Sequence, residues 1–170
     1  MEFLINSGIA LSAGAARRSW EYVMELVGEY TFAAPRERVW QQMLDPVVLK
    51  GCLPGCEKLE LIGEDEYEAT MKIGIAMIKG TFAGTVKIFD KIDNESYTMA
   101  IQGSGPQGQV KGAGKLEFVE DGEKTIVKYH GTADVSGTIA RVGARMIQPA
   151  AKSISGQFFK CAESKIESGS

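Results

Sequence analysis

Apolar and polar residues alternate through most of the chain after residue 24, a pattern that predicts β-strands with one buried face. In the first run, residues 25–32, Leu26, Tyr30 and Phe32 share a face with Gly28. Further strands are expected at residues 58–62, 67–75, 82–88, 97–103, 112–118 and 127–135. Gly, Asp and Asn separate these runs, so we predict an antiparallel meander with one polar and one apolar face.

Helical patterns flank this meander. A short helix follows the first strand and ends at Asp45, because the residue before a proline avoids helical geometry. Asp45 can then cap a second short helix that runs to about Cys52. A long helix is expected over residues 138–165, and Pro149 inside it should cause a kink. The predicted fold class is therefore α+β, with the order strand, two short helices, six strands and one long helix.

Glycines recur on the apolar face of the predicted sheet. They are Gly28, Gly84, Gly103, Gly112, Gly114 and Gly131. Glycines in strands permit strong bending and leave out side chains that would fill space. A bent sheet wrapped around the long helix can therefore enclose a pocket. The alternative is that the glycines let the helix approach closely and no cavity remains.

Methionine and aromatic residues are abundant on the same face. Methionine is adaptable, and apolar ligand sites are lined mainly by such side chains. We expect the ligand-binding residues to be Tyr30, Phe32, Met71, Ile73, Phe82, Met99, Ile101, Met146 and Phe158. For each of these residues taken singly, an ordinary packed core is the competing interpretation.

The length of the chain limits the number of domains. The 170 residues fit one domain, which we place at residues 24–166, with an extension at 1–23 outside the core fold and a tail at 167–170. The extension could instead form a short docking helix at residues 9–22.

A net charge of −3 gives no reason to expect a nucleic-acid partner. No apolar run is long enough for a membrane span, and Arg17 follows the first apolar stretch, the wrong order for a secretory signal, so a cytoplasmic protein is expected.

The stretch LKGCLPGCEKLE, which begins at residue 49, contains two of the three cysteines. Their C-x-x-x-C spacing is not that of a zinc or thioredoxin-type motif, and Pro54-Gly55 between them is typical of a turn. We expect reduced thiols that pack as small apolar groups, and no metal site. The only histidine, His130, lies on the polar face of its strand. Nothing assembles a nucleophile with a base, so no catalytic residue is expected.

Several segments resemble the CoxG family of carbon monoxide dehydrogenase subunits. They are MELVGEY from residue 24, APRERVW from residue 34, CLPGCE from residue 52, GSG from residue 103 and QFF from residue 157. The resemblance implies a START-like (SRPBCC) helix-grip fold, in which a curved seven-stranded antiparallel sheet holds the C-terminal helix over a hydrophobic cavity.

The same resemblance implies a function. Family members accompany the molybdenum CO dehydrogenase and are associated with membrane attachment or electron delivery. The chain is thus expected to be a non-catalytic accessory subunit with no tightly bound cofactor, holding a quinone or lipid. Its expected partners are the dehydrogenase subunits and, peripherally, the inner membrane face. The alternative is a cyclase- or aromatase-like enzyme of the same fold.

Overall fold

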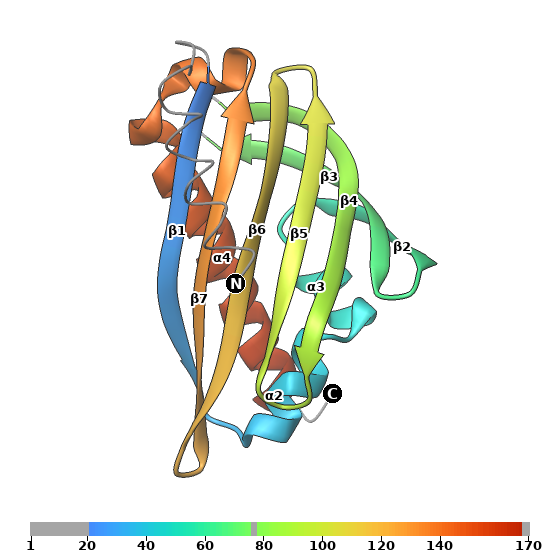
Figure 1. Ribbon diagram of the computed structural model, residues 1–170, viewed down its shortest axis with the longest axis vertical. Helices are drawn as coiled ribbons and strands as arrows, with labels where there is room; N and C mark the ends of the chain where they lie inside the picture. Colours follow the sequence, from blue (N-terminus) through green and yellow to red (C-terminus); the bar gives the residue numbers. More distant parts are fainter. Residues whose placement is uncertain (1–20, 76–77, 168–170) are drawn as a thin grey trace.

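The computed structural model describes residues 21–75 and 78–167, which form one curved antiparallel sheet with a long helix across its concave face (Figure 1). Two short helices lie at the end of the sheet where the long helix finishes (Figure 1). The sheet has seven strands, as the family resemblance implied. The predicted α+β helix-grip architecture is confirmed.

The elements follow the predicted order. They are β1 (Glu21–Phe32), α2 (Arg36–Met43), α3 (Pro46–Cys52), β2 (Cys56–Gly63), β3 (Glu66–Ile75), β4 (Ile78–Ile92), β5 (Ser96–Gly105), β6 (Gly108–Asp121), β7 (Lys124–Ser136), the 3-10 helix η1 (Thr138–Val142) and α4 (Ala144–Glu167). The strands lie in the order β1-β7-β6-β5-β4-β3-β2. Each strand from β2 to β7 pairs with its neighbour in the chain, and β1 pairs with β7. Strands β1 and β2 are therefore the two sheet edges.

The first strand begins earlier than the sequence suggested. Strand β1 starts at Glu21, which pairs with Ser136 of β7. Residues 21–23, which the sequence pattern assigned to the N-terminal extension, thus belong to the sheet. The remainder of that extension, with most of the possible helix at 9–22, lies outside the described residues, as does the tail from residue 168 onward.

The predicted single helix at residues 138–165 is interrupted at Gly143, so this prediction is wrong in one respect. Gly143 has a φ of +78°, a conformation that L side chains rarely adopt and that ends η1. Its carbonyl oxygen accepts hydrogen bonds from the amides of Met146 and Ile147, each at 3.1 Å, and so begins α4. Pro149 lies inside α4, and the kink expected there stays a prediction.

Specific hydrogen bonds join the short helices to the rest of the fold. The Asp45 carboxylate accepts from the amide of Val47 at 2.9 Å, which confirms the predicted cap of α3. Arg38 on α2 donates to the carbonyl of Ile166 at 2.8 Å and satisfies a free carbonyl in the last turn of α4. The Arg38 bond fixes the end of the long helix against α2, whereas the Asp45 bond is local to α3.

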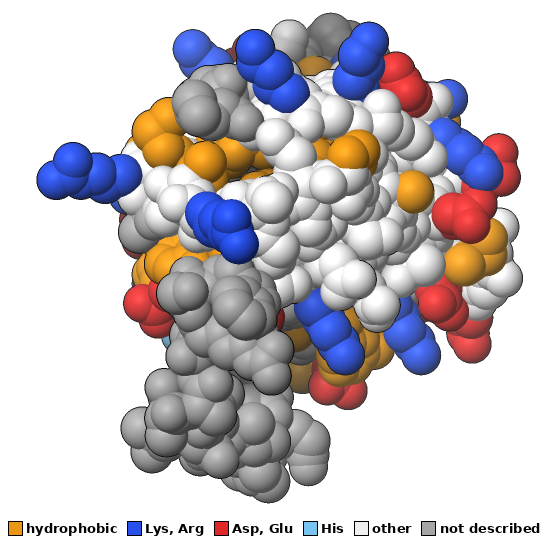
Figure 2. Space-filling view, turned by 90° about the horizontal axis from the view of Figure 1, so that it is seen from above, with side chains coloured by type: hydrophobic (Ala, Val, Ile, Leu, Met, Phe, Trp, Pro, Cys, Tyr) orange, Lys and Arg blue, Asp and Glu red, His pale blue; other side chains and the backbone are white. Residues whose placement is uncertain are grey.

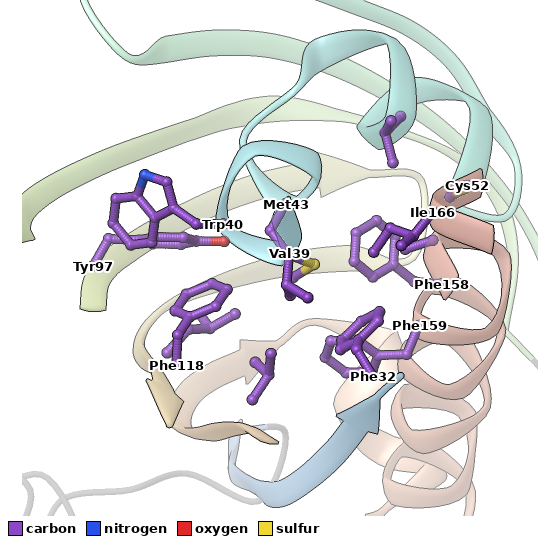
Figure 3. Close-up of a cluster of buried hydrophobic side chains, with 14 of the residues drawn as sticks. Phe32, Val39, Trp40, Met43, Cys52, Tyr97, Phe118, Phe158, Phe159 and Ile166 are labelled. Carbon is purple, nitrogen blue, oxygen red and sulfur yellow. The ribbon is translucent and has the colours of Figure 1, made fainter. Parts of the chain in front are cut away.

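The buried side chains form two separate clusters. The first core cluster lies where α2, α3 and the second half of α4 meet the sheet (Figure 3) and includes Phe32, Val39, Trp40, Met43, Tyr97, Leu116, Phe118, Val127, Phe158, Phe159, Ala162 and Ile166. The second core cluster lies at the opposite end, around η1 and the start of α4, and consists of Ile78, Phe82, Val135, Ile139, Ala140, Ile147 and Ala150. The molecule therefore has a core at each end of the sheet.

The structure corrects the cysteine prediction. Cys52, the last residue of α3, forms a disulfide with Cys161 on α4, with 5.3 Å between their Cα atoms, so these two are not reduced thiols. Cys56 is free and half-buried, and burial raises the pKa of its thiol. The predicted turn between the two cysteines of the C-x-x-x-C stretch is confirmed, because α3 ends at Cys52 and β2 begins at Cys56. Gly55 has a φ of +78° there, and its carbonyl accepts from the amide of Lys72 at 2.7 Å.

Candidate ligand-binding site

The middle of the concave sheet face, between the two core clusters, is the candidate site. Its apolar side chains point to the same face of the sheet as the buried side chains of the two clusters. They nevertheless keep part of their surface accessible. They include Leu26 on β1, Met71 on β3, Val86 on β4 and Ile101 on β5. A side chain that faces the interior and is still only half-buried borders space that a water-sized molecule can reach. We call this region the central section.

The long helix is also less buried in its middle than at its two ends. Near its start, Ile147 and Ala150 are buried in the second core cluster. About two turns after Ala150, Phe158 is buried in the first core cluster. Between them, Ala151 and Ile154 are only half-buried. The helix thus packs tightly at both ends and loosely in the middle, opposite the central section.

The glycines contribute less to this space than the sequence suggested. A Cβ added at Gly84 or Gly112 would collide with a backbone carbonyl of the next strand, Gln102 or Thr132 respectively. A Cβ at Gly28 would meet the ring of Tyr129 at 2.7 Å. These three glycines therefore permit close approach of strands and rings rather than leaving a gap. At Gly103 the nearest atom to an added Cβ is the Ala83 carbonyl oxygen at 3.9 Å, so this position has room.

The structure distributes the nine predicted ligand-binding residues over three places. Tyr30, Phe32, Met99 and Phe158 belong to the first core cluster or pack against it. Phe82 belongs to the second core cluster, and Ile73 packs against it. Met71, Ile101 and Met146 are half-buried and outside both clusters, where they can border the central section.

The nine predicted ligand-binding residues differ in how much side-chain surface a ligand could contact. Phe32 is 0% exposed and has no surface to offer a ligand in this conformation. Phe82 and Phe158 are at most 8% exposed and serve mainly as walls that end the central section. The ligand-binding role of the whole set remains a prediction.

An acidic residue that sequence reasoning missed lies at the edge of the site. Tyr30 on β1 donates a 2.6 Å hydrogen bond to Oε1 of Glu163 on α4. Burial and, after it, the hydrogen bond and charge of Glu163 raise the pKa of Tyr30 to about 12. The Tyr30 ring also stacks on Phe159, with 5.3 Å between ring centroids, and Phe159 stacks in turn on Tyr129. The helical stripe of apolar residues gave no signal for Glu163, because a glutamate next to that stripe is usually solvated.

A depression also lies on the outer face of the sheet. It has a volume of about 440 Å³ and is lined by Val27, Gly28, Glu29, Lys115, Glu117, Lys128, Tyr129 and His130. Nε2 of His130 lies 2.9 Å from a carboxylate oxygen of Glu25, and both side chains are exposed. The depression carries charged side chains of both signs, Glu29 and Glu117 with Lys115 and Lys128, unlike the uncharged lining predicted for the site.

The described residues set limits on the chemistry. Within residues 21–75 and 78–167, no group of three or more His, Cys, Asp and Glu side chains is placed to hold a metal ion. Over the same ranges, no helix has both the length and the apolarity needed to cross a membrane.

Solved structures of other proteins share this fold. An aromatase/cyclase (ZhuI) from Streptomyces sp. R1128 matches with a TM-score of 0.61 and 16% identity, over 86% of this chain and 94% of that chain. Norcoclaurine synthase from Thalictrum flavum matches with a TM-score of 0.61 and 16% identity, over 89% and 90% of the two chains. At this level of identity the likeness establishes the helix-grip fold alone.

Closer matches define the family. The CoxG family of carbon monoxide dehydrogenase subunits matches residues 28–167, most of the chain. A conserved protein from Geobacillus kaustophilus is 33% identical, with a TM-score of 0.83, over 85% of this chain and 96% of that chain. A comparison with curated protein sequences gives no match. The chain belongs to the CoxG family.

Proposed function

We propose that this protein is a non-catalytic accessory partner of a molybdenum CO dehydrogenase and holds an apolar small molecule, a quinone or a lipid, in the central section. Membership of the CoxG family supports the association with the dehydrogenase. In this proposal the protein serves electron delivery or attachment at the inner membrane face, and the redox chemistry belongs to the partner.

One observation carries the ligand-binding half of the proposal. The inward-facing side chains of the central section are apolar but only half-buried, whereas those at both ends of the sheet are buried. Leaving apolar surface accessible costs roughly 25 cal/mol per Å² relative to burial. An apolar ligand that covers Met71, Ile101 and Ile154 would recover this free energy.

The cyclase or aromatase alternative rests on the fold neighbours and on the Tyr30–Glu163 pair, a potential acid–base couple. General acid–base catalysis works best when the pKa of the group lies near the working pH. With a pKa of about 12, the Tyr30 phenol stays protonated at neutral pH and is a poor base. The pair is better suited to joining β1 to α4, so the accessory function is preferred.

Native mass spectrometry of protein purified from its own host tests the proposal directly. We expect a non-covalent adduct with the mass of a quinone or a lipid, lost on denaturation. Thermal unfolding with added quinones and lipids provides the second readout, since a ligand that binds only the folded state raises Tm. A protein with no adduct, and a Tm that no quinone or lipid changes, would contradict ligand binding.

A further inference from the structure

Tyr129 on β7 lies where the first core cluster ends and the central section begins. Its ring packs against that cluster and stacks on Phe159 of α4, with 5.3 Å between the ring centroids. The neighbouring residues of β7 on the same face are Val127, which is fully buried, and Gly131. Gly131 lies opposite Gly114 of β6, so on that side no side chain of β6 or β7 covers Tyr129. The ring is thus packed on the side of the cluster and uncovered by these strands on the side of the central section.

The hydroxyl of Tyr129 lies over Gly28 of the adjacent strand β1. A Cβ built on Gly28 would be 2.5 Å from the hydroxyl oxygen and 2.7 Å from Cζ, so the phenol occupies the place of a side chain there. Gly28 shares its face of β1 with Leu26, a half-buried residue of the central section. The absence of a side chain at Gly28 therefore lets β7 place a polar group at the edge of an otherwise apolar region.

Within residues 21–75 and 78–167, the hydroxyl of Tyr129 has no hydrogen-bond partner. By contrast, the Tyr22 hydroxyl on β1 donates to Gln148 at 2.9 Å. Tyr30 on the same strand donates to Glu163. Burial raises the pKa of Tyr129, so its phenol stays protonated and able to donate at neutral pH. A half-buried phenol usually finds a hydrogen-bond partner, and for Tyr129 that partner lies outside the described part of the chain.

We propose that the Tyr129 hydroxyl donates a hydrogen bond to a carbonyl oxygen of the ligand in the central section. This inference rests on the proposed function, because it assigns a recognition group to the same site. A carbonyl is the acceptor that quinones and acyl lipids share. Figure 2 looks onto the opposite end of the molecule, near the β5–β6 turn, where hydrophobic side chains appear in hollows between the backbone atoms. The carbonyl end of the ligand is thus held at Tyr129, and its apolar remainder extends toward that end. Water is the competing partner of the hydroxyl.

Titration with two probes of the same shape isolates the carbonyl. Dimethylnaphthoquinone, methylated at both ring carbons that a thiol would otherwise attack, carries carbonyl oxygens, and dimethylnaphthalene carries none. Tyr129→Phe removes only the hydroxyl and should weaken the affinity for the naphthoquinone by roughly threefold to tenfold, the effect of one hydrogen bond. The affinity for dimethylnaphthalene should not change. The matched control Tyr97→Phe removes a hydroxyl within the first core cluster and should change neither affinity.

Infrared spectra of the bound naphthoquinone report the hydrogen bond itself. A hydrogen bond weakens a carbonyl double bond, so the carbonyl band should lie at lower frequency in the wild type than in Tyr129→Phe. This readout separates a direct contact from a change in packing. Methyl laurate, which carries an ester carbonyl on an acyl chain, is titrated into the same proteins. Dependence on Tyr129 for the naphthoquinone alone identifies a quinone as the ligand, and dependence for methyl laurate alone identifies an acyl lipid.

The outcomes separate this inference from the proposed function. A wild type that takes up none of the three probes would contradict ligand binding and, with it, the role of Tyr129. If the wild type binds probes but Tyr129→Phe binds each of them equally well, with an unchanged carbonyl band, the role of Tyr129 is overturned and ligand binding stands. Water would then be the partner of the hydroxyl. An equal loss of affinity for the naphthoquinone and for dimethylnaphthalene would also overturn it, because the hydroxyl would then act through packing.

Discussion

The hydroxyl of Tyr30 donates a 2.6 Å hydrogen bond to the carboxylate of Glu163 and so joins the edge strand β1 to the last third of α4. Strand β1 has no strand partner on its outer side, and α4 packs against it across the concave face (Figure 1). The stacked ring of Phe159 strengthens the same junction. This junction closes the β1 side of the first core cluster, next to the central section.

The raised pKa of Tyr30, caused by burial and then by Glu163, predicts a loss of stability in alkali. The pKa of Tyr30 is about 12 in the folded protein and about 10 in an unfolded chain, so the unfolded state loses its proton first. The free energy of unfolding should therefore fall as the pH rises above about 10 and go on falling until about 12. In the Tyr30→Phe variant this fall should be smaller, as measured by urea unfolding at a series of pH values.

Wild type must be compared with Tyr30→Phe because burial also raises the pKa of Tyr97. Tyr97 therefore contributes to the loss of stability in alkali in both proteins. At neutral pH, Tyr30→Phe removes a partly buried hydrogen bond and should cost about 0.5–1.5 kcal/mol. Identical pH profiles for wild type and Tyr30→Phe would contradict the raised pKa of Tyr30 in the folded protein.

The disulfide between Cys52 and Cys161 should contribute strongly to stability. It joins residues 109 positions apart, and a cross-link that closes so long a loop restricts the unfolded chain. Cys161→Ser should lower the free energy of unfolding by about 2–5 kcal/mol. Cys56→Ser, the matched control, should change it little, because Cys56 is free. A thiol titration of the native protein that finds three reactive groups instead of one would contradict this pairing.

Two glycines of the concave face should respond oppositely to alanine. At Gly112 the added Cβ collides with the Thr132 carbonyl, so Gly112→Ala should destabilise the protein by about 1–3 kcal/mol. At Gly103 the nearest atom is 3.9 Å away, so Gly103→Ala should be neutral or stabilising by up to about 1 kcal/mol, through a less flexible unfolded chain. Urea unfolding of both variants gives the comparison, and equal destabilisation would contradict the geometry described for Gly103.

The isolated protein should not oxidise CO. An all-cysteine iron–sulfur cluster needs four thiolates, and the chain has three cysteines, two of them in a disulfide. Dye reduction with CO as the donor should therefore stay at background, and rates near those of a dehydrogenase would contradict the accessory role.

Local patterns in the sequence were sufficient for the elements. Alternation at period two placed the strands, and Asp45 before Pro46 marked the boundary between the short helices. The interruption at Gly143 was missed because the apolar stripe continues across it from Ile139 to Met146, and only the backbone reveals the positive φ.

Contacts between residues far apart in the sequence could not be predicted from it. The partner of Cys52 depends on how α3 lies against α4, which no spacing in the sequence encodes. The same holds for Tyr30 and Glu163, which are 133 residues apart. Alternation correctly placed Phe32 and Met71 on the concave face, but it could not tell that one is fully buried and the other half-buried. That difference depends on where α4 and the short helices cover the sheet.

The most direct test of the central claim is a titration of a fluorescent hydrophobic probe into wild type, Gly103→Leu and Gln102→Leu. Gly103 lies on the concave face, with open space beyond its Cα, so leucine there should occupy the central section without unfolding the domain. Gln102, its neighbour in β5, is exposed on the other face of the sheet. Gln102→Leu is therefore a control that introduces the same side chain outside the central section. The account predicts that wild type and Gln102→Leu take up the probe with the same affinity and stoichiometry, while Gly103→Leu stays folded and takes up little or none. A wild type that takes up no probe, or a Gly103→Leu variant that binds it as well as the control, would contradict an apolar cavity in the central section.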